Sequence, residues 1–206
     1  MIRRTFAIGS VGPAEAADAD ALAPILREAD VREIAALDGR DPGEALRYSI
    51  DNAKFALALR DPSGAPVSLL GVGWIRTNPR AGHAWFVSSD RLDAFALVFL
   101  ERVRASFDAM VAGHDVVSNW VHEPNAVTLR WLRWLGFERL SRHVAPSSGE
   151  AFLEMARFAS PAVRDLYVER DWNRYHATLP ARAELADQGF AFPSPAGHHG
   201  ANGSDA

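Results

Sequence analysis

Three consecutive strand-like segments, followed by a long amphipathic pattern, constrain the fold of this chain more than any other feature. The segments span residues 55–59, 67–75 and 83–88, and turn sequences rich in Pro and Gly separate them. Strands joined by short turns pair antiparallel, so these segments predict neighbouring strands of one sheet. The apolar residues that follow are three or four apart, as on the buried face of a helix: Leu92, Phe95, Ala96, Phe99, Val103, Phe107 and Met110.

Helical segments precede this sheet. Residues 3–9 predict a short first strand, and helical spacing then runs from Leu22 to Leu37 until Gly39 stops it. Asp41 begins the next helix as its N-cap, because Pro42 follows at the first helical position and an acidic residue stands at the third.

The C-terminal half adds further elements. A strand over 115–121 is followed by a short helix from Pro124 to about Leu135, and a strand pair over 137–144 and 151–158 ends the pattern. The predicted fold is α/β, with a mixed, mostly antiparallel sheet flanked by helices in the order β-α-α-β-β-β-α-β-α-β-β. We expect a folded domain over 1–158, a helical extension over 159–192 and a disordered tail over 193–206.

Composition excludes several chemistries. The chain has no Cys, so disulfides, thiolate metal sites and a Cys nucleophile are excluded. Lys54 is the single lysine among 22 basic residues. We expect no metal site, because His198 and His199 lack further ligands nearby. The formal net charge of -4 argues against a strongly basic nucleic-acid binder, and no apolar run is long enough for a signal or membrane segment.

One segment carries a resemblance to a known family. Asn125 to Phe137 reads NAVTLRWLRWLGF, in which an Asn opens a helix that ends in Leu-Gly-Phe. This segment and the element order are similar to the GNAT (N-acetyltransferase) superfamily. Gly136 fits a left-handed helix end, and Phe137 fits the buried start of the next strand.

A narrower resemblance extends over roughly residues 20–140. Residues 26–53, Gly71 to Trp74 and Ala84 to Phe86 look like parts of the podophage internal virion protein A family. Asn119 to Val121 and the Trp-Leu-Gly-Phe helix end also match. The resemblance implies a role in virion assembly or as a minor virion component. It implies other phage virion or assembly proteins as partners, and the virion or the host cytoplasm as the location. We expect no membrane contact, and the sequence gives no direct evidence for nucleic-acid binding.

The GNAT resemblance also implies an acetyl-CoA site, in which amides of a Gly-rich loop bind the pyrophosphate at the start of the long helix. Residues 86–93 correspond to that loop and contain no Gly. Ser89 or Asp90 instead predicts an N-cap that would occupy those amides. We therefore expect no cofactor, or acetyl-CoA if the chain is active. The candidate cofactor-binding residues are Phe86, Val87, Ser88, Ser89, Arg91 and Asn125.

The chemistry of acetyl transfer also requires an acid and a base. Active GNAT members commonly place a Tyr acid seven residues after the helix-opening Asn, and Leu132 occupies that position here. His122 and Glu123 are the candidate catalytic bases, since they follow the strand that ends at the expected cleft. Two hypotheses follow: a non-catalytic phage protein that reuses the fold, or a divergent acyl-CoA-dependent N-acetyltransferase.

Overall fold

The computed structural model describes residues 9–75, 78–94, 104–109, 111–146 and 148–170. Within these ranges, seven strands form one sheet in the order β1-β2-β3-β4-β5-β7-β6. All neighbouring strands pair antiparallel except β4 and β5, which are parallel. The predicted fold class is therefore confirmed. The strands are β1 (Ser10–Pro13), β2 (Ala53–Arg60), β3 (Pro66–Trp74), β4 (Ala81–Ser88), β5 (Val116–His122), β6 (Glu138–Val144) and β7 (Ala151–Phe158).

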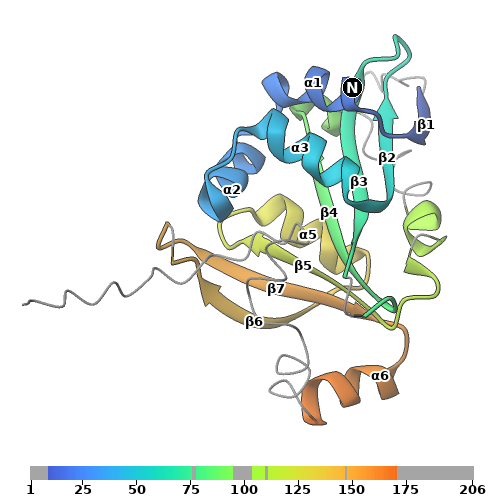
Figure 1. The fold of residues 1–206 in the computed structure, drawn as a ribbon, viewed down its shortest axis with the longest axis vertical. Coiled ribbons are helices and arrows are strands. Elements are labelled where there is room, and N and C mark those ends of the chain that lie inside the picture. The colour runs from blue at the N-terminus through green and yellow to red at the C-terminus, as the bar shows by residue number, and fades with distance from the viewer. Residues whose placement is uncertain (1–8, 76–77, 95–103, 110, 147, 171–206) are drawn as a thin grey trace, which may run out of the picture.

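Helices cover both faces of the sheet (Figure 1). Leu69 and Leu70 of β3 are successive residues and so point to opposite faces. Leu69 packs in one cluster with α1 (Ala16–Leu22) and α3 (Pro42–Asp51). Leu70 packs in another with Phe107 and with α5 (Ala126–Trp134). None of the helices in the described ranges combines the length and hydrophobicity needed to cross a membrane.

Several predicted helix ends are confirmed. Asp41 caps α3, because its carboxylate accepts hydrogen bonds from the amides of Gly43 at 2.9 Å and Glu44 at 3.1 Å. Gly39 ends α2 (Glu28–Asp38) in the left-handed conformation, with a φ of 74°. Gly136 has a φ of 88° after α5, and the next residue, Phe137, is buried.

The helical pattern from Leu22 to Leu37 is interrupted in the structure. A short 3-10 helix (Ala23–Ile25) follows α1, and Leu26 and Arg27 are extended, with ψ angles of 148° and 142°. Leu26 forms an isolated antiparallel bridge with Ser89 of the sheet. Pairing with the sheet therefore overrides the helical periodicity at this point.

Other predictions are corrected or lie outside the described residues. The first described strand begins at Ser10, and the predicted strand over 3–9 lies outside these residues except for Gly9. Asp90–Ala94 form a 3-10 helix and 104–109 are α-helical, whereas the middle of the predicted long helix is not described. The chain continues through α6 (Pro161–Asp165) and a π-helical turn (Leu166–Arg170). The rest of the predicted 159–192 extension and the 193–206 tail are not described.

Candidate functional site

The candidate site is the opening between β4 and β5. These parallel strands pair only at Ala81 with Val116, Gly82 with Val117 and His83 with Ser118. Beyond this point β4 stays paired with β3 as far as Ser88, and β5 stays paired with β7 as far as His122. The two strands therefore diverge, and each turns one edge of its backbone toward the opening.

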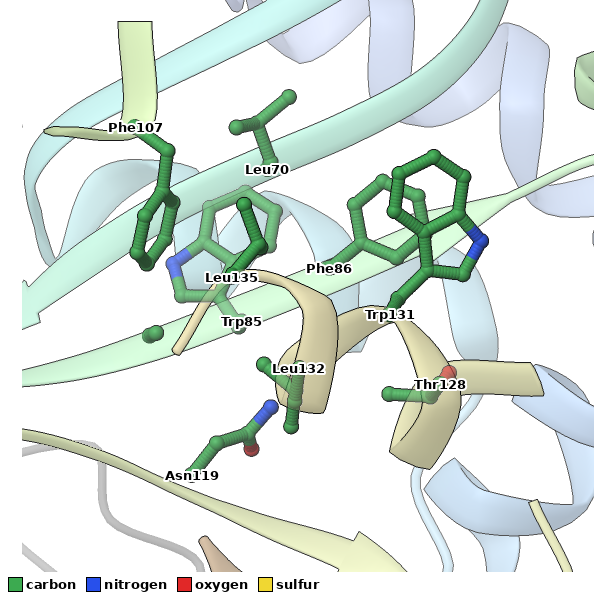
Figure 2. Close-up of a pocket in the computed structure, with 10 residues that line it drawn as sticks. Leu70, Trp85, Phe86, Phe107, Asn119, Thr128, Trp131, Leu132 and Leu135 are labelled. Carbon is green, nitrogen blue, oxygen red and sulfur yellow. The ribbon is translucent and has the colours of Figure 1, made fainter. Parts of the chain in front are cut away.

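An apolar pocket lies in this opening (Figure 2). Phe86 of β4 and Trp131 of α5 contact each other there, with ring centroids 6.2 Å apart. Thr128 and Asn119 are the polar members, and the buried Thr128 hydroxyl has no hydrogen-bond partner among the described residues. The pocket is lined by Leu70, Ala84, Trp85, Phe86, Phe107, Asn119, Thr128, Trp131, Leu132 and Leu135.

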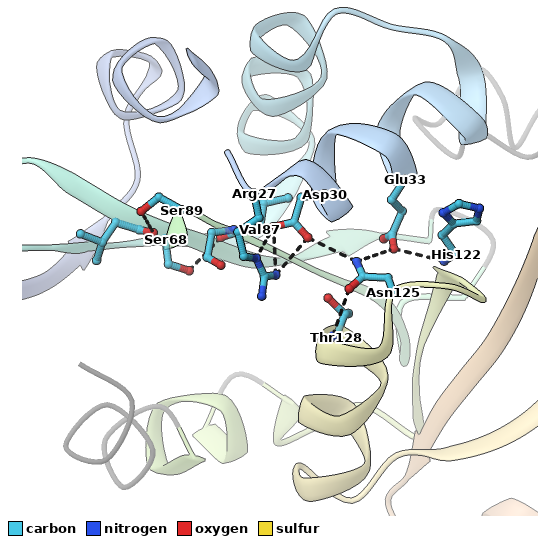
Figure 3. A network of polar contacts seen from close by, with 11 residues as sticks. Arg27, Asp30, Glu33, Ser68, Val87, Ser89, His122, Asn125 and Thr128 are labelled. Carbon is cyan, nitrogen blue, oxygen red and sulfur yellow. Dashed lines mark hydrogen bonds and ion pairs between the residues drawn. The ribbon is translucent and has the colours of Figure 1, made fainter. Parts of the chain in front are cut away.

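A buried ion pair from α2 occupies the edge of β4 at the end of the opening (Figure 3). The Arg27 guanidinium donates through Nε and Nη2 to the Asp30 carboxylate at 2.9–3.0 Å. Asp30 Oδ2 also accepts a hydrogen bond from the Ser88 amide at 2.9 Å. The Ser88 carbonyl accepts one from the Arg27 amide at 2.9 Å. Both backbone groups of Ser88 are therefore taken by the segment that begins α2.

The same network extends to the end of β5. Asn125 Nδ2 donates to Glu33 Oε2 at 2.9 Å and to Asp30 Oδ1 at 3.3 Å. Glu33 Oε2 also accepts a hydrogen bond from the amide of His122 at 3.1 Å. Asn125 begins α5, as predicted, and caps it: its side-chain oxygen Oδ1 accepts a hydrogen bond from the Thr128 amide at 3.2 Å. One helix, α2, thus ties the ends of both diverging strands together.

Burial changes the acidity of the two α2 carboxyls. Burial raises the pKa of Glu33 to about 8, and the hydrogen bond from Asn125 only partly opposes it. Burial also raises the pKa of Asp30, against the opposing charge of Arg27. The protonated form of Glu33 is therefore favoured near neutral pH, at the end of the opening where β5 stops.

Another buried carboxyl lies away from the opening. Burial raises the pKa of Glu154, on β7, to about 7. Its carboxylate accepts hydrogen bonds from the Ser141 hydroxyl at 2.7 Å and from the Tyr167 hydroxyl at 3.4 Å. Its contacts therefore link β7 to β6 and to the turn after α6.

The two predicted bases occupy different surroundings. His122 is 6% exposed, and its ring lies 5.3 Å from that of Phe152 while Nε2 is 3.3 Å from a Glu150 carboxylate oxygen. Its imidazole points away from Glu33 (Figure 3). Glu123 forms an ion pair with Arg142, whose hydrogen bond lowers the pKa of Glu123. A carboxylate paired in this way is a weak base for an amine.

Several predicted cofactor residues are engaged elsewhere. Ser89 donates both its amide and its hydroxyl to the Val67 carbonyl, at 2.9 and 3.2 Å, so it is not a side-chain helix cap. Arg91 forms an ion pair with Asp61. Val87 packs against the α1 and α3 cluster, on the face away from the pocket. Of the predicted set, Phe86 lines the pocket, whereas Ser88 and Asn125 belong to the α2 network.

Acetyl-CoA would meet internal hydrogen bonds at the end of β4. The Ser88 amide and carbonyl, at the end of the β4 edge that faces the opening, are both already bonded within the chain. The Ser89 and Leu92 amides, which begin the loop corresponding to the pyrophosphate site, are bonded to Val67 and Ser89 carbonyls. Leu132, 4% exposed, is part of the core and offers no proton.

Arg27, Asp30 and Glu33 were not identified as site residues from the sequence. Their three-residue spacing places them along one helical face, which is a recognisable signal. Charged side chains on a helix usually face the solvent, so the sequence alone predicts that these three side chains are exposed. Among the described residues no group of three His, Asp or Glu side chains has the arrangement of a metal site.

Comparison with known proteins shows the fold. No protein-family model and no curated protein matches the chain. A phosphinothricin acetyltransferase from Sinorhizobium meliloti in complex with acetyl-CoA is similar in structure, with a TM-score of 0.55 and 20% identity over 74% of this chain and 89% of that one.

Two further solved structures are similar. One is a GCN5-related N-acetyltransferase from Kribbella flavida, with a TM-score of 0.53, 18% identity and coverage of 72% of this chain and 96% of that one. The other is an N-acetyltransferase from Staphylococcus aureus, with a TM-score of 0.55, 11% identity and coverage of 73% and 98%. The chain thus has the fold of the GNAT acetyltransferases.

Proposed function

We propose that this protein is a non-catalytic GNAT-fold protein that acts by binding other proteins. The observation that carries this proposal is the engagement of both Ser88 backbone groups by α2. A fold does not fix a function, and here the edge on which a thioester cofactor would pair is used for internal packing. Leu132, at the position of the expected proton donor, supports the same conclusion.

The proposed setting is the assembly of a phage particle. Its support is the resemblance of residues 20–140 to the podophage internal virion protein A family. The partners would be other virion or assembly proteins, and the protein would be found in the virion or in the host cytoplasm. Co-purification with assembled particles tests this setting, whereas recovery only in the particle-free fraction would contradict it.

Titration calorimetry with acetyl-CoA tests the absence of catalysis. The proposal predicts no binding heat at millimolar ligand, because the β4 edge is occupied. Micromolar binding, together with acetylation of an amine by the purified protein, would contradict it.

A divergent acyl-CoA-dependent N-acyltransferase is the second candidate. Glu33 favours it, because a carboxyl with a pKa of about 8 beside the opening can exchange a proton with an amine near neutral pH. An acetylation assay with wild type and Glu33→Gln separates the two candidates. Activity in wild type that falls by about 100-fold or more in the variant would support the enzyme.

A further inference from the structure

We infer that residues 26–33 form an internal plug, and that the Arg27–Asp30 pair keeps the β4 edge closed to an acyl-CoA ligand. Removing both side chains frees the Ser88 amide and the space beside Phe86, while the Arg27 amide stays bonded to the Ser88 carbonyl. The variant is therefore expected to bind an acyl-CoA ligand more tightly than wild type does. This inference rests on the proposed absence of cofactor binding in wild type. The plug would explain why wild type binds no acyl-CoA ligand, and its removal would restore that binding.

The plug pairs with the end of β4 in the way that a short additional strand would. Leu26 forms an antiparallel bridge with Ser89, and the Arg27 amide bonds to the Ser88 carbonyl. The backbone groups of Ser88 point away from β3, so those of Phe86, two residues earlier, point in the same direction. A ligand that pairs with this edge would run along Phe86 and then meet the plug at Ser88.

Side chains hold the plug in place. Asp30 contacts β4 through the Ser88 amide, and Asn125 donates to Asp30 from the start of α5. The Arg27 guanidinium lies 6.0 Å from the centroid of the Phe86 ring, which lines the pocket. Arg27 and Asp30 are 8% and 2% exposed, so this contact fills the space between α2 and the sheet.

Both partners must be removed together, because a single substitution leaves an uncompensated buried charge. Arg27→Ala/Asp30→Ala leaves the Ser88 amide without its side-chain acceptor and opens the space beside Phe86. The matched control is Glu28→Ala/Arg32→Ala, which removes an exposed ion pair from the same helix.

Titration calorimetry with CoA and with acetyl-CoA tests the plug. The Arg27→Ala/Asp30→Ala variant is expected to bind at least about tenfold more tightly than wild type, and the control variant is expected to match wild type. A folded double variant that binds no better than wild type overturns the plug. Tight binding by wild type instead overturns the proposed function, so the two failures are distinguishable.

A second double variant tests the plug in case the alanine variant fails to fold. Arg27→Met/Asp30→Met replaces the ion pair with flexible apolar side chains, a change that buried ion pairs often tolerate without loss of stability. It also leaves the Ser88 amide without an acceptor but keeps the space beside Phe86 filled, so its gain in ligand binding should be smaller than that of the alanine variant. If both double variants lose cooperative thermal unfolding, the pair is required for the fold and the plug inference is overturned.

Discussion

The Asp30 carboxylate accepts a hydrogen bond from the Ser88 amide at 2.9 Å, although the two residues are 58 positions apart. This bond joins the first turn of α2 to the last residue of β4. It places the Asp30 carboxylate on the edge of β4 that faces the opening between β4 and β5. The consequences for stability, acidity and ligand binding can be tested separately.

The first prediction concerns Asp30 itself. Asp30→Ala leaves Arg27 buried without its partner, so the free energy of unfolding should fall by about 3–5 kcal/mol. Urea denaturation measures this change. The control Glu28→Ala breaks an exposed pair and should cost at most about 0.5 kcal/mol. A loss below about 1 kcal/mol for Asp30→Ala would show that the buried pair does not stabilise α2 on the sheet.

The second prediction concerns pH. Burial raises the folded-state pKa of Glu33 from its ordinary 4.5 to about 8, so the folded protein holds this proton more tightly than the unfolded chain does. The resulting stabilisation is present below the ordinary value and is lost as the pH rises toward about 8. Glu154, with a pKa of about 7, acts in the same direction.

Unfolding measured from about pH 5 to about pH 8 should show stability falling by up to about 1.4 kcal/mol per pH unit for each group. Glu33→Gln and Glu154→Gln should each flatten this profile, and the double variant should flatten it most. A wild-type profile that rises over this range would contradict the raised pKa values of Glu33 and Glu154.

The third prediction concerns the packing of Trp85 against β3. A Cβ at Gly71 would lie 2.6 Å from the Trp85 indole, so Gly71→Ala overpacks the core and should cost about 1–3 kcal/mol. Gly73→Ala is the matched control, because its nearest neighbour would be 3.7 Å away. Thermal melting should separate the two variants. Equal melting temperatures would refute the close approach at Gly71.

The fourth prediction concerns the single lysine. Lys54 lies at a bulge between Ala53 and Phe55, and its ammonium contacts the carbonyls of Pro79 and Ala81 at 2.9 and 3.0 Å. It also lies 2.9 Å from His114 Nε2. A planar guanidinium cannot reproduce these contacts, so Lys54→Arg should cost about 1–2 kcal/mol.

The exposed Arg47→Lys serves as the control for this charge-conserving exchange, and it should leave the unfolding free energy unchanged within about 0.5 kcal/mol. Equal stability of Lys54→Arg and wild type in urea denaturation would show that the ammonium geometry is not required.

Local signals in the sequence were sufficient to predict most of the fold. The Asp41 cap, the glycine helix ends and the strand pair before and after residues 147–149 depend on neighbouring residues, and their positions were close to those observed. The break at Leu26 was missed, because it results from pairing with Ser89, far along the chain. Helical periodicity contains no information about such a contact.

The candidate site was only partly predictable. The loop without Gly, the helix start at Asn125 and a Leu at the position of the expected acid were apparent from residue type and spacing. The role of Arg27, Asp30 and Glu33 was not, since their burial depends on how α2 lies across the ends of β4 and β5. The proposed roles of His122 and Glu123 stay predictions, and the structure adds Glu33, which accepts a hydrogen bond from the His122 amide.

Hydrogen exchange at the Ser88 amide, measured with and without millimolar acetyl-CoA, tests the central claim most directly. If α2 closes the β4 edge, this amide is protected in the free protein, and the cofactor leaves its exchange rate unchanged. An amide that exchanges freely in the free protein and becomes protected when acetyl-CoA is added would contradict the account.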